Sequence, residues 1–201
     1  MRLYGQDGTR LYINEIERKR FVAAANASSR RVRTLCLTLA YTGCRLSEAL
    51  ALTGNSFGLD QSTVTVRTLK KRDRHMFREI PIPPALCEMI ECDRYRAPTE
   101  QLWPMCRATA WRQVKAVMAQ ADIFGKQATP KGLRHGFGVH GCFRGVQLHM
   151  LQKWMGHANI STTAIYANAI GPEEYAIAAR MWDDPPTIQT ATDCDDKPSV
   201  G

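Results

Sequence analysis

The chain has 201 residues, 44% of them hydrophobic and 23% charged, and it carries a formal net charge of +8. That length is enough for one well-buried domain, and no apolar run approaches the roughly 18 residues that a membrane span requires. The first residues contain no apolar stretch typical of a signal peptide, so we expect a soluble protein of the bacterial cytoplasm or nucleoid.

The hydrophobic pattern has a helical period in the first part of the chain. It predicts helices at 14–26 and 30–42, with Asn14 as the N-cap of the first, and a short helix at 46–52. The period then changes to two. Val64 and Val66 alternate with polar residues, a charged turn follows at 70–74, and 77–82 is expected to return as a second strand.

Helical patterns resume after the Pro83-Pro84 pair and continue to Trp182. They predict helices at 84–96, 107–121, 130–144, 147–155, 159–168 and 172–182. The expected fold is therefore mainly α with a small antiparallel β-sheet, an α+β arrangement. Residues 183–201 contain few large apolar side chains and are predicted to be disordered.

The basic charge is concentrated ahead of this tail. Residues 183–201 contain five Asp and one Lys, so residues 1–182 carry +12. Lys and Arg gain free energy when they release counterions from nucleic acid, which favours a polyanionic partner. On charge alone, a merely soluble basic protein is equally compatible.

The seven cysteines indicate no covalent or metal framework. Their number is odd and no pair has the C-x-x-C spacing, so neither disulfides nor a zinc site is supported. The sequence also has no P-loop and no cluster of carboxylates suited to two-metal catalysis. We therefore expect neither a cofactor nor a catalytic metal.

Three segments combine residues that could carry chemistry. They are T-G-C-R-L-S-E at 42–48, P-K-G-L-R-H-G-F at 130–137, and W-M-G-H at 154–157, the last followed nine residues after its histidine by Tyr166. Each has an ordinary structural explanation when taken alone. Arg45 could pair with Glu48 at i+3, and Gly156-His157 could be a helix C-cap.

Together, in this order and spacing, the segments resemble the tyrosine recombinase (phage integrase) family over about residues 12 to 182. The resemblance implies the catalytic-domain fold of that family and a site-specific DNA recombinase of the integrase, invertase or resolvase type. The family residues map onto Arg45 and Arg134 as phosphate-binding arginines, His157 as a third donor, and Tyr166 as the nucleophile. Arginine suits this task because its permanent charge and planar fork bind two phosphate oxygens at once.

The resemblance also implies proton-transfer residues. Lys131 occupies the position of a His or Lys that helps proton transfer from the tyrosine. Lys70, with Lys71 as the alternative, would be the hairpin lysine that protonates the 5′-oxygen leaving group. Glu48 and His135 are expected to support the site. A covalent 3′-phosphotyrosyl bond would conserve the phosphodiester energy, so that no ATP is required.

The layout is expected to be a catalytic domain at 1–182 and an acidic tail at 183–201, without the N-terminal core-binding domain of about 80–100 residues that most relatives carry. The short fimbrial phase-variation recombinases share this layout. Expected partners are double-stranded DNA at specific sites, three further copies in a homotetramer and an accessory protein. Two alternatives are type IB topoisomerase-like relaxation and a non-catalytic DNA-binding regulator with the same fold.

Overall fold

A computed structural model describes residues 2–68, 76–96 and 98–168, together with positions 175, 178, 179 and 181; side chains are not described at 92–96. The chain divides into two units, 1–169 and 170–201. The predicted helix at 172–182 falls largely, and the acidic tail at 183–201 entirely, outside the described residues. Among the described residues, no helix combines the length and apolar character needed to cross a membrane.

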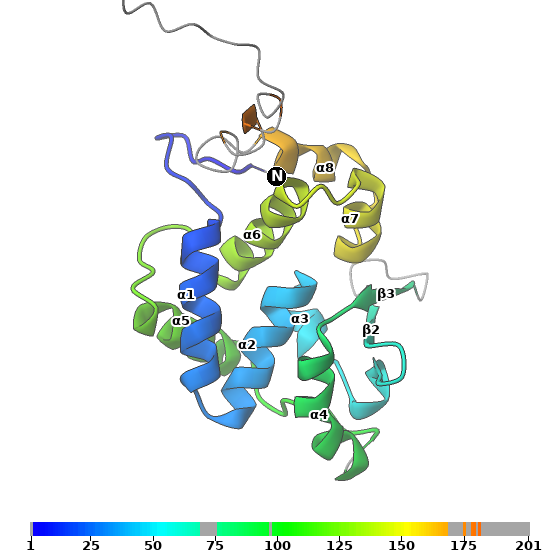
Figure 1. Ribbon diagram of the computed structural model, residues 1–201. Coiled ribbons are helices and arrows are strands. Elements are labelled where there is room, and N and C mark those ends of the chain that lie inside the picture. Colours follow the sequence, from blue (N-terminus) through cyan, green and yellow to red (C-terminus); the bar gives the residue numbers. More distant parts are fainter. Residues whose placement is uncertain are drawn as a thin grey trace, which may run out of the picture. The chain divides into compact units, whose positions relative to one another are not determined.

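The first unit is mainly helical with one small sheet, as predicted (Figure 1). Its elements in chain order are α1 (Glu15–Ala27), α2 (Arg30–Thr42), α3 (Leu46–Ala49), η1 (Gly54–Ser56), β1 (Phe57–Gly58), β2 (Thr63–Arg67), β3 (Phe77–Pro81), α4 (Pro84–Arg96), α5 (Arg107–Gln120), α6 (Pro130–Phe143), α7 (Leu148–Met155), α8 (Ser161–Ala164) and η2 (Ile165–Asn168).

Local chemistry explains where the helices begin and end. The Asn14 side chain accepts a hydrogen bond from the backbone of Glu17, and the Glu17 carboxylate accepts one from the backbone of Asn14. The two bonds form a capping box at the expected N-cap of α1. Gly43 ends α2 with φ of 58°, a left-handed conformation that favours glycine. A Cβ at Gly43 would lie 2.4 Å from Cδ1 of Phe137. Close approach of α2 and α6 therefore requires glycine here.

The sheet is antiparallel in the order β1-β2-β3, and its period-two pattern decides which side chains are buried. Val64 pairs with Ile80, and Val66 pairs with Arg78. All four side chains lie on the buried face, whereas Phe77 is 62% exposed. The strands β2 and β3 were predicted; β1, which has only two residues, was not.

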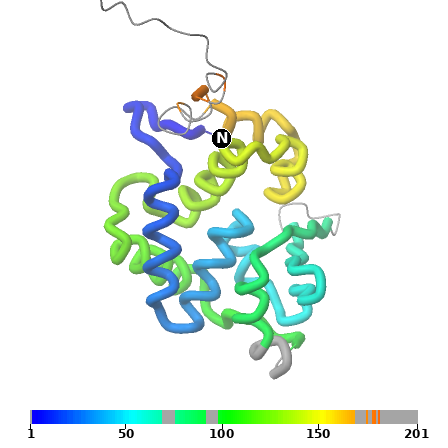
Figure 2. The backbone as a smooth tube through the Cα atoms, in the orientation of Figure 1, coloured from blue at the N-terminus to red at the C-terminus, as the bar shows by residue number. Residues whose placement is uncertain are grey.

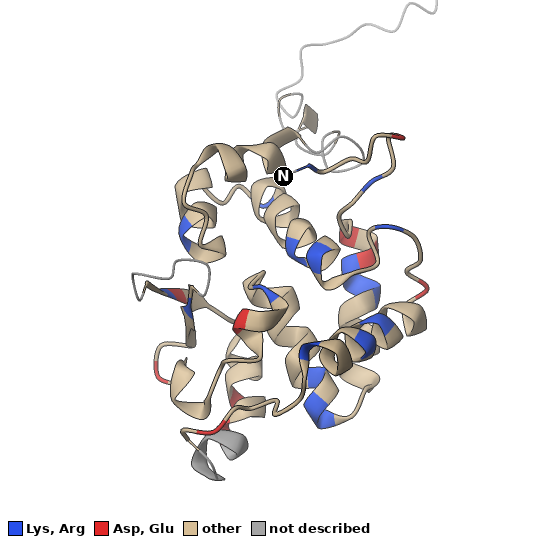
Figure 3. Cartoon of the chain, turned by 180° about the vertical axis from the view of Figure 1, so that it is seen from behind, with Lys and Arg blue, Asp and Glu red and all other residues tan. Residues whose placement is uncertain are grey.

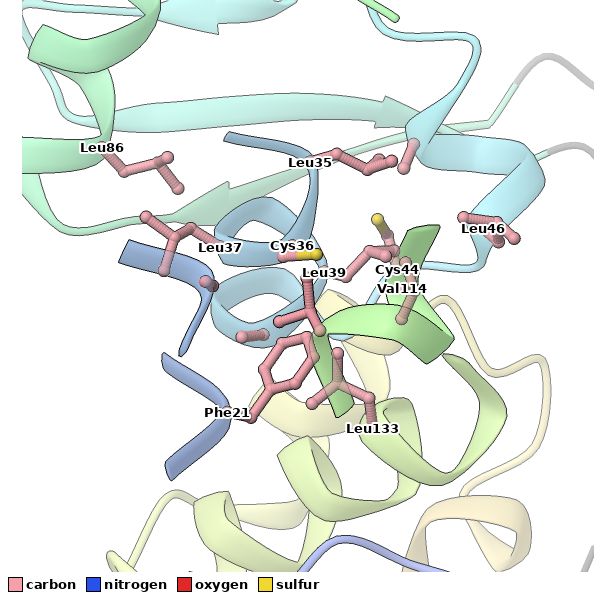
Figure 4. Packing of buried hydrophobic residues seen from close by; sticks show 14 of the residues in the cluster. Phe21, Leu35, Cys36, Leu37, Leu39, Cys44, Leu46, Leu86, Val114 and Leu133 are labelled. Atoms are coloured by element: carbon pink, nitrogen blue, oxygen red, sulfur yellow. The ribbon is translucent and has the colours of Figure 1, made fainter. Parts of the chain in front are cut away.

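The main core is built around α2, which is buried along much of its length. Figure 4 shows Leu35, Leu37 and Leu39 of α2 among side chains from other helices, including Phe21 of α1 and Leu133 of α6. These contacts join α1, α2 and α6, so the segment after α2 and the start of α6 are held beside one another. Two of the three predicted chemical segments begin at these points.

Candidate active site

A cavity of about 820 Å³ opens beside the three segments singled out by their sequence. Basic residues dominate the charged part of its lining: Arg45, Arg107, Lys126, Lys131 and Arg134. The cavity is also lined by His157 and by Trp111, whose side chain is 42% exposed. In the view of Figure 3, Lys and Arg segments are distributed over several helices of the same unit. Such a cavity favours an anionic ligand.

Arg45 lies at the start of α3 and reaches the cavity with a side chain that is 31% exposed. Its Nη1 donates to Oε1 of Glu48 at 2.6 Å, and its backbone N–H donates to Oε2 of the same carboxylate at 2.9 Å. The i,i+3 spacing places the two residues on one face of the turn. Glu48 therefore orients Arg45 while its own side chain is fully buried.

Arg134 comes from α6 and is only 5% exposed. Its Nη1 donates to the carbonyl of Gly43 and its Nη2 to the carbonyl of Met155, both at 2.7 Å. Burial, and next the neighbouring charge of Arg45, lower the pKa of Arg134 to about 10. The guanidinium is still charged at neutral pH, and it connects the other two segments at the cavity wall.

His157 follows α7, which ends at Gly156 with φ of 64°. Its Nδ1 lies 2.9 Å from Oγ1 of Thr163, whereas its buried Nε2 has no hydrogen-bond partner among the described residues. Burial, and then Arg134 and Arg45, lower the pKa of His157 to about 3. The ring is therefore neutral at pH 7 and has a ring nitrogen available for a ligand in the cavity.

Tyr166, the expected nucleophile, lies in η2 and is only 1% exposed. Its hydroxyl lies 3.3 Å from Nδ1 of His135, and its ring stacks on His157 with centroids 6.1 Å apart. Burial raises the pKa of Tyr166 to about 12, and burial lowers the pKa of His135 to about 4. A neutral imidazole next to a neutral phenol can accept its proton in a hydrogen bond.

The tyrosine is packed inside a small second hydrophobic cluster. Its other buried members are Leu3, Tyr12, Val139 and Met155. Two of these belong to the N-terminal segment, which Figure 2 shows running beside the part of the chain that holds α6 and η2. In this structure the Tyr166 hydroxyl is therefore buried within the protein, and Tyr166 does not line the cavity.

The remaining predicted residues divide into two groups. Lys131 is exposed on the first turn of α6 and lines the cavity. Lys70 and Lys71 lie outside the described residues. The structure therefore brings together Arg45, Glu48, Lys131, Arg134, His135, His157 and Tyr166 from three separate segments.

Sequence reasoning missed a buried arginine, Arg78 of β3. It is 6% exposed, and its Nη2 donates to Oε2 of Glu48 at 2.6 Å. Burial would raise the pKa of Glu48, but the charge of Arg78 and the hydrogen bonds to the carboxylate hold that pKa below its ordinary value. The alternation of Ile80 and Ile82 contains the signal, since it places position 78 on the same buried face of the strand.

Comparison with known proteins identifies the family. The model of the phage integrase family matches residues 10–170, and the chain belongs to this family. It is 31% identical over 169 residues to the tyrosine recombinase XerA of Pyrococcus furiosus, covering 77% of this chain and 56% of that protein. It is 29% identical over 174 residues to XerD of Neisseria meningitidis serogroup A, covering 78% and 57%.

Solved structures agree with this assignment at the level of the fold. The crystal structure of XerA recombinase superimposes with a TM-score of 0.73 at 24% identity, covering 86% of this chain and 65% of that one. The post-cleavage complex of XerH with palindromic difH substrate gives 0.72 at 21% identity, covering 92% and 57%. The catalytic domain of bacteriophage HP1 integrase gives 0.57 at 25% identity, covering 87% and 97%. The chain thus spans little more than half the length of the curated relatives it matches.

Proposed function

We propose that this chain is the catalytic domain of a site-specific DNA recombinase that cuts and rejoins DNA through Tyr166. The observation that carries the proposal is the basic cavity, where Arg45, Arg134 and His157 converge beside a buried tyrosine. The chain's membership of the phage integrase family supports the same reaction. The relatives named above are tyrosine recombinases and an integrase, which favours recombination over topoisomerase-like relaxation or a regulatory role.

In the proposed reaction, the scissile phosphate of duplex DNA occupies the cavity. Arg45 and Arg134 stabilise the negative charge that grows on the nonbridging oxygens, and Nε2 of His157 donates a third hydrogen bond. Removal of one donor of this kind typically slows the chemical step by about 10²–10³-fold. The two arginines are already held by protein groups, so little reorganisation is needed when the phosphate binds.

The covalent step requires Tyr166 to leave its buried position and approach the phosphate. Its oxygen forms a bond to phosphorus, the bond from phosphorus to the 5′-oxygen breaks, and the DNA 3′-phosphate becomes attached to the tyrosine. The phenolic proton passes to solvent water with the help of Lys131, and Lys70, or else Lys71, donates a proton to the departing 5′-oxygen. Glu48 and His135 act indirectly, by holding Arg45 and the resting hydroxyl.

The whole assembly is also a proposal. Exchange between two DNA sites needs two duplexes and four active sites, so we propose a homotetramer on synapsed DNA and allow for an accessory protein. The 172–182 segment, with Tyr175 and Trp182, is the candidate for docking into a neighbouring copy. Light scattering on a cross-linked synaptic complex tests this; a mass equal to one protein copy per DNA duplex contradicts it.

The reaction is tested by covalent trapping. The full chain is incubated with a randomised library of nicked duplexes, without metal or ATP, and denaturant-resistant adducts are isolated. A nick beside the cleavage point releases a short 5′-hydroxyl strand and prevents religation. We expect an adduct that Tyr166→Phe abolishes and that Tyr12→Phe retains; Tyr12 is the matched control because it is equally buried in the same cluster.

The outcomes separate the competing functions. Sequencing the trapped DNA identifies the recognised site. An adduct that survives in Tyr166→Phe contradicts the assigned nucleophile. Binding of DNA with no adduct from the unaltered chain contradicts the enzymatic proposal and favours a regulator.

A further inference from the structure

Arg78 bonds to three separate parts of the first unit. Its Nη2 donates to Glu48, its Nη1 to Oγ1 of Thr68 at 2.9 Å, and its Nε to the carbonyl of Trp154 at 2.8 Å. Thr68 directly follows β2, and Trp154 lies in the last turn of α7. A planar guanidinium with five fixed donors can bridge such partners, whereas a lysine ammonium cannot match this geometry.

One of these bonds reaches Arg45 through a shared carboxylate. Glu48 is fully buried, and its Oε1 binds Arg45 while its Oε2 binds Arg78, both at 2.6 Å. One carboxylate between two arginines leaves the trio with a net positive charge. Arg45 and Glu48 alone would form a neutral pair, and the cavity would attract an anion less strongly.

Another bond reaches the segment that carries His157. The guanidinium holds the carbonyl of Trp154 and lies against Gly156, where a Cβ would come within 3.0 Å of Nη1 of Arg78. Gly156 is the left-handed residue that turns the chain from α7 into His157. Arg78 therefore fixes the backbone at Trp154 and Gly156, which sets the position of the His157 imidazole.

We infer that Arg78 is a positioning residue, which gives the cluster of Arg45, Glu48 and Arg78 a net positive charge and places His157 for the scissile phosphate. This inference rests on the proposed function and extends it to a residue that does not line the basic cavity. Arg78 supports two of the three phosphate donors, Arg45 through Glu48 and His157 through Gly156. Loss of its guanidinium should therefore displace both donors from the phosphate. If Arg78 only stabilised the fold, its substitution would instead lower the rate of adduct formation equally on every substrate.

The test compares two DNA substrates that differ in charge at one position. One carries the normal scissile phosphate and the other a methylphosphonate, in which a methyl group replaces a nonbridging oxygen and removes the negative charge. Single-turnover adduct formation is measured under saturating DNA for the unaltered chain, Arg78→Met and Arg78→Lys. Arg18→Met is the matched control, since Arg18 is also a partly buried arginine that donates to a backbone carbonyl, but its partners are Ala40 and Tyr41 of α2 instead of Glu48 and Trp154.

We expect Arg78→Met to slow adduct formation on the phosphate by roughly ten- to a hundredfold, which is less than the full loss of one oxyanion donor. On the methylphosphonate the loss should be only about threefold, because a methyl group replaces one charged oxygen and the transition state carries less negative charge for Arg45 to stabilise. Arg78→Lys keeps the positive charge beside Glu48 and should recover part of the phosphate rate. Should Arg78→Met not fold, Arg78→Lys still tests the inference, since its deficit must also be larger on the phosphate.

Equal losses on the two substrates, or a ratio matching that of Arg18→Met, overturn the positioning role. If the unaltered chain forms no adduct on either substrate, the proposed function itself has failed, and the role of Arg78 fails with it. The two failures are therefore distinguished by the behaviour of the unaltered chain.

Discussion

The buried position of Tyr166 depends on the absence of a side chain at Gly138 of α6. A Cβ built there would lie 2.6 Å from both Cδ2 and Cε2 of the tyrosine ring, so Gly138→Ala must displace the ring or the helix. Overpacking of this kind costs about 1–3 kcal/mol. Alanine in place of a helical glycine returns about 0.5–1 kcal/mol of helix propensity.

A double-mutant cycle separates these two contributions. In the unaltered background Gly138→Ala should lower the free energy of unfolding by roughly 0.5–2 kcal/mol, and in a Tyr166→Ala background it should raise it by about 0.5–1 kcal/mol. Denaturant unfolding of all four proteins measures the coupling, expected at about 1–3 kcal/mol. Gly141→Ala is the control, because its added Cβ would meet Leu151 instead of the tyrosine; its effect should be the same in both backgrounds.

The same substitution has a consequence for the proposed chemistry. A ring that is less stably buried is more often available to the cavity, so Gly138→Ala should form the covalent adduct faster than the unaltered chain at a temperature where both are folded. A coupling energy near zero, or tyrosine burial unchanged in the Gly138→Ala protein, would refute the reasoning about the close contact.

Two further predictions concern stability. Burial lowers the pKa of His135 to about 4 and of His157 to about 3. The free energy of unfolding is therefore highest above the unfolded pKa near 6.5 and falls as the pH drops toward the folded pKa values, because the unfolded chain binds the protons first. Each histidine should account for about 2–3 kcal/mol between pH 7 and pH 4.5. Urea midpoints at pH 7 and pH 4.5 measure this, and a flat profile contradicts it. Thr34→Val removes the acceptor of the indole N–H of Trp103, 3.1 Å away, and should cost about 1–3 kcal/mol. Thr38→Val is the control, since its buried hydroxyl has no hydrogen-bond partner among the described residues; equal losses in the two variants would show that the bond to Trp103 is not responsible.

The helices and the β2–β3 pairing could be predicted because their periodicity is strong and agrees with the capping residues. The spacing of Arg45, Arg134, His157 and Tyr166 was likewise visible, because the residue types and intervals are features of the sequence itself. The two-residue strand β1 could not be predicted, since so short a segment has no measurable period and forms only by pairing with β2.

The role of Arg78 and the burial of Tyr166 could not be predicted from the sequence, for a different reason. Arg78 is a charged residue in an expected strand, and the sequence does not show the contacts with Glu48 and Trp154 that compensate its burial. Burial of Tyr166 depends on side chains from the N-terminal segment and on Gly138, which are distant in the sequence. Tertiary contacts, which one sequence does not list, decide both positions.

The most direct test of the account is to locate the DNA end within the covalent adduct. The full chain is trapped on a selected nicked duplex, digested with protease, and the DNA-linked peptide is identified by mass spectrometry. We expect a single phosphodiester bond from Tyr166 to a DNA 3′-phosphate, with a free 5′-hydroxyl on the released strand. Attachment through another residue, or to a 5′-phosphate, would contradict it.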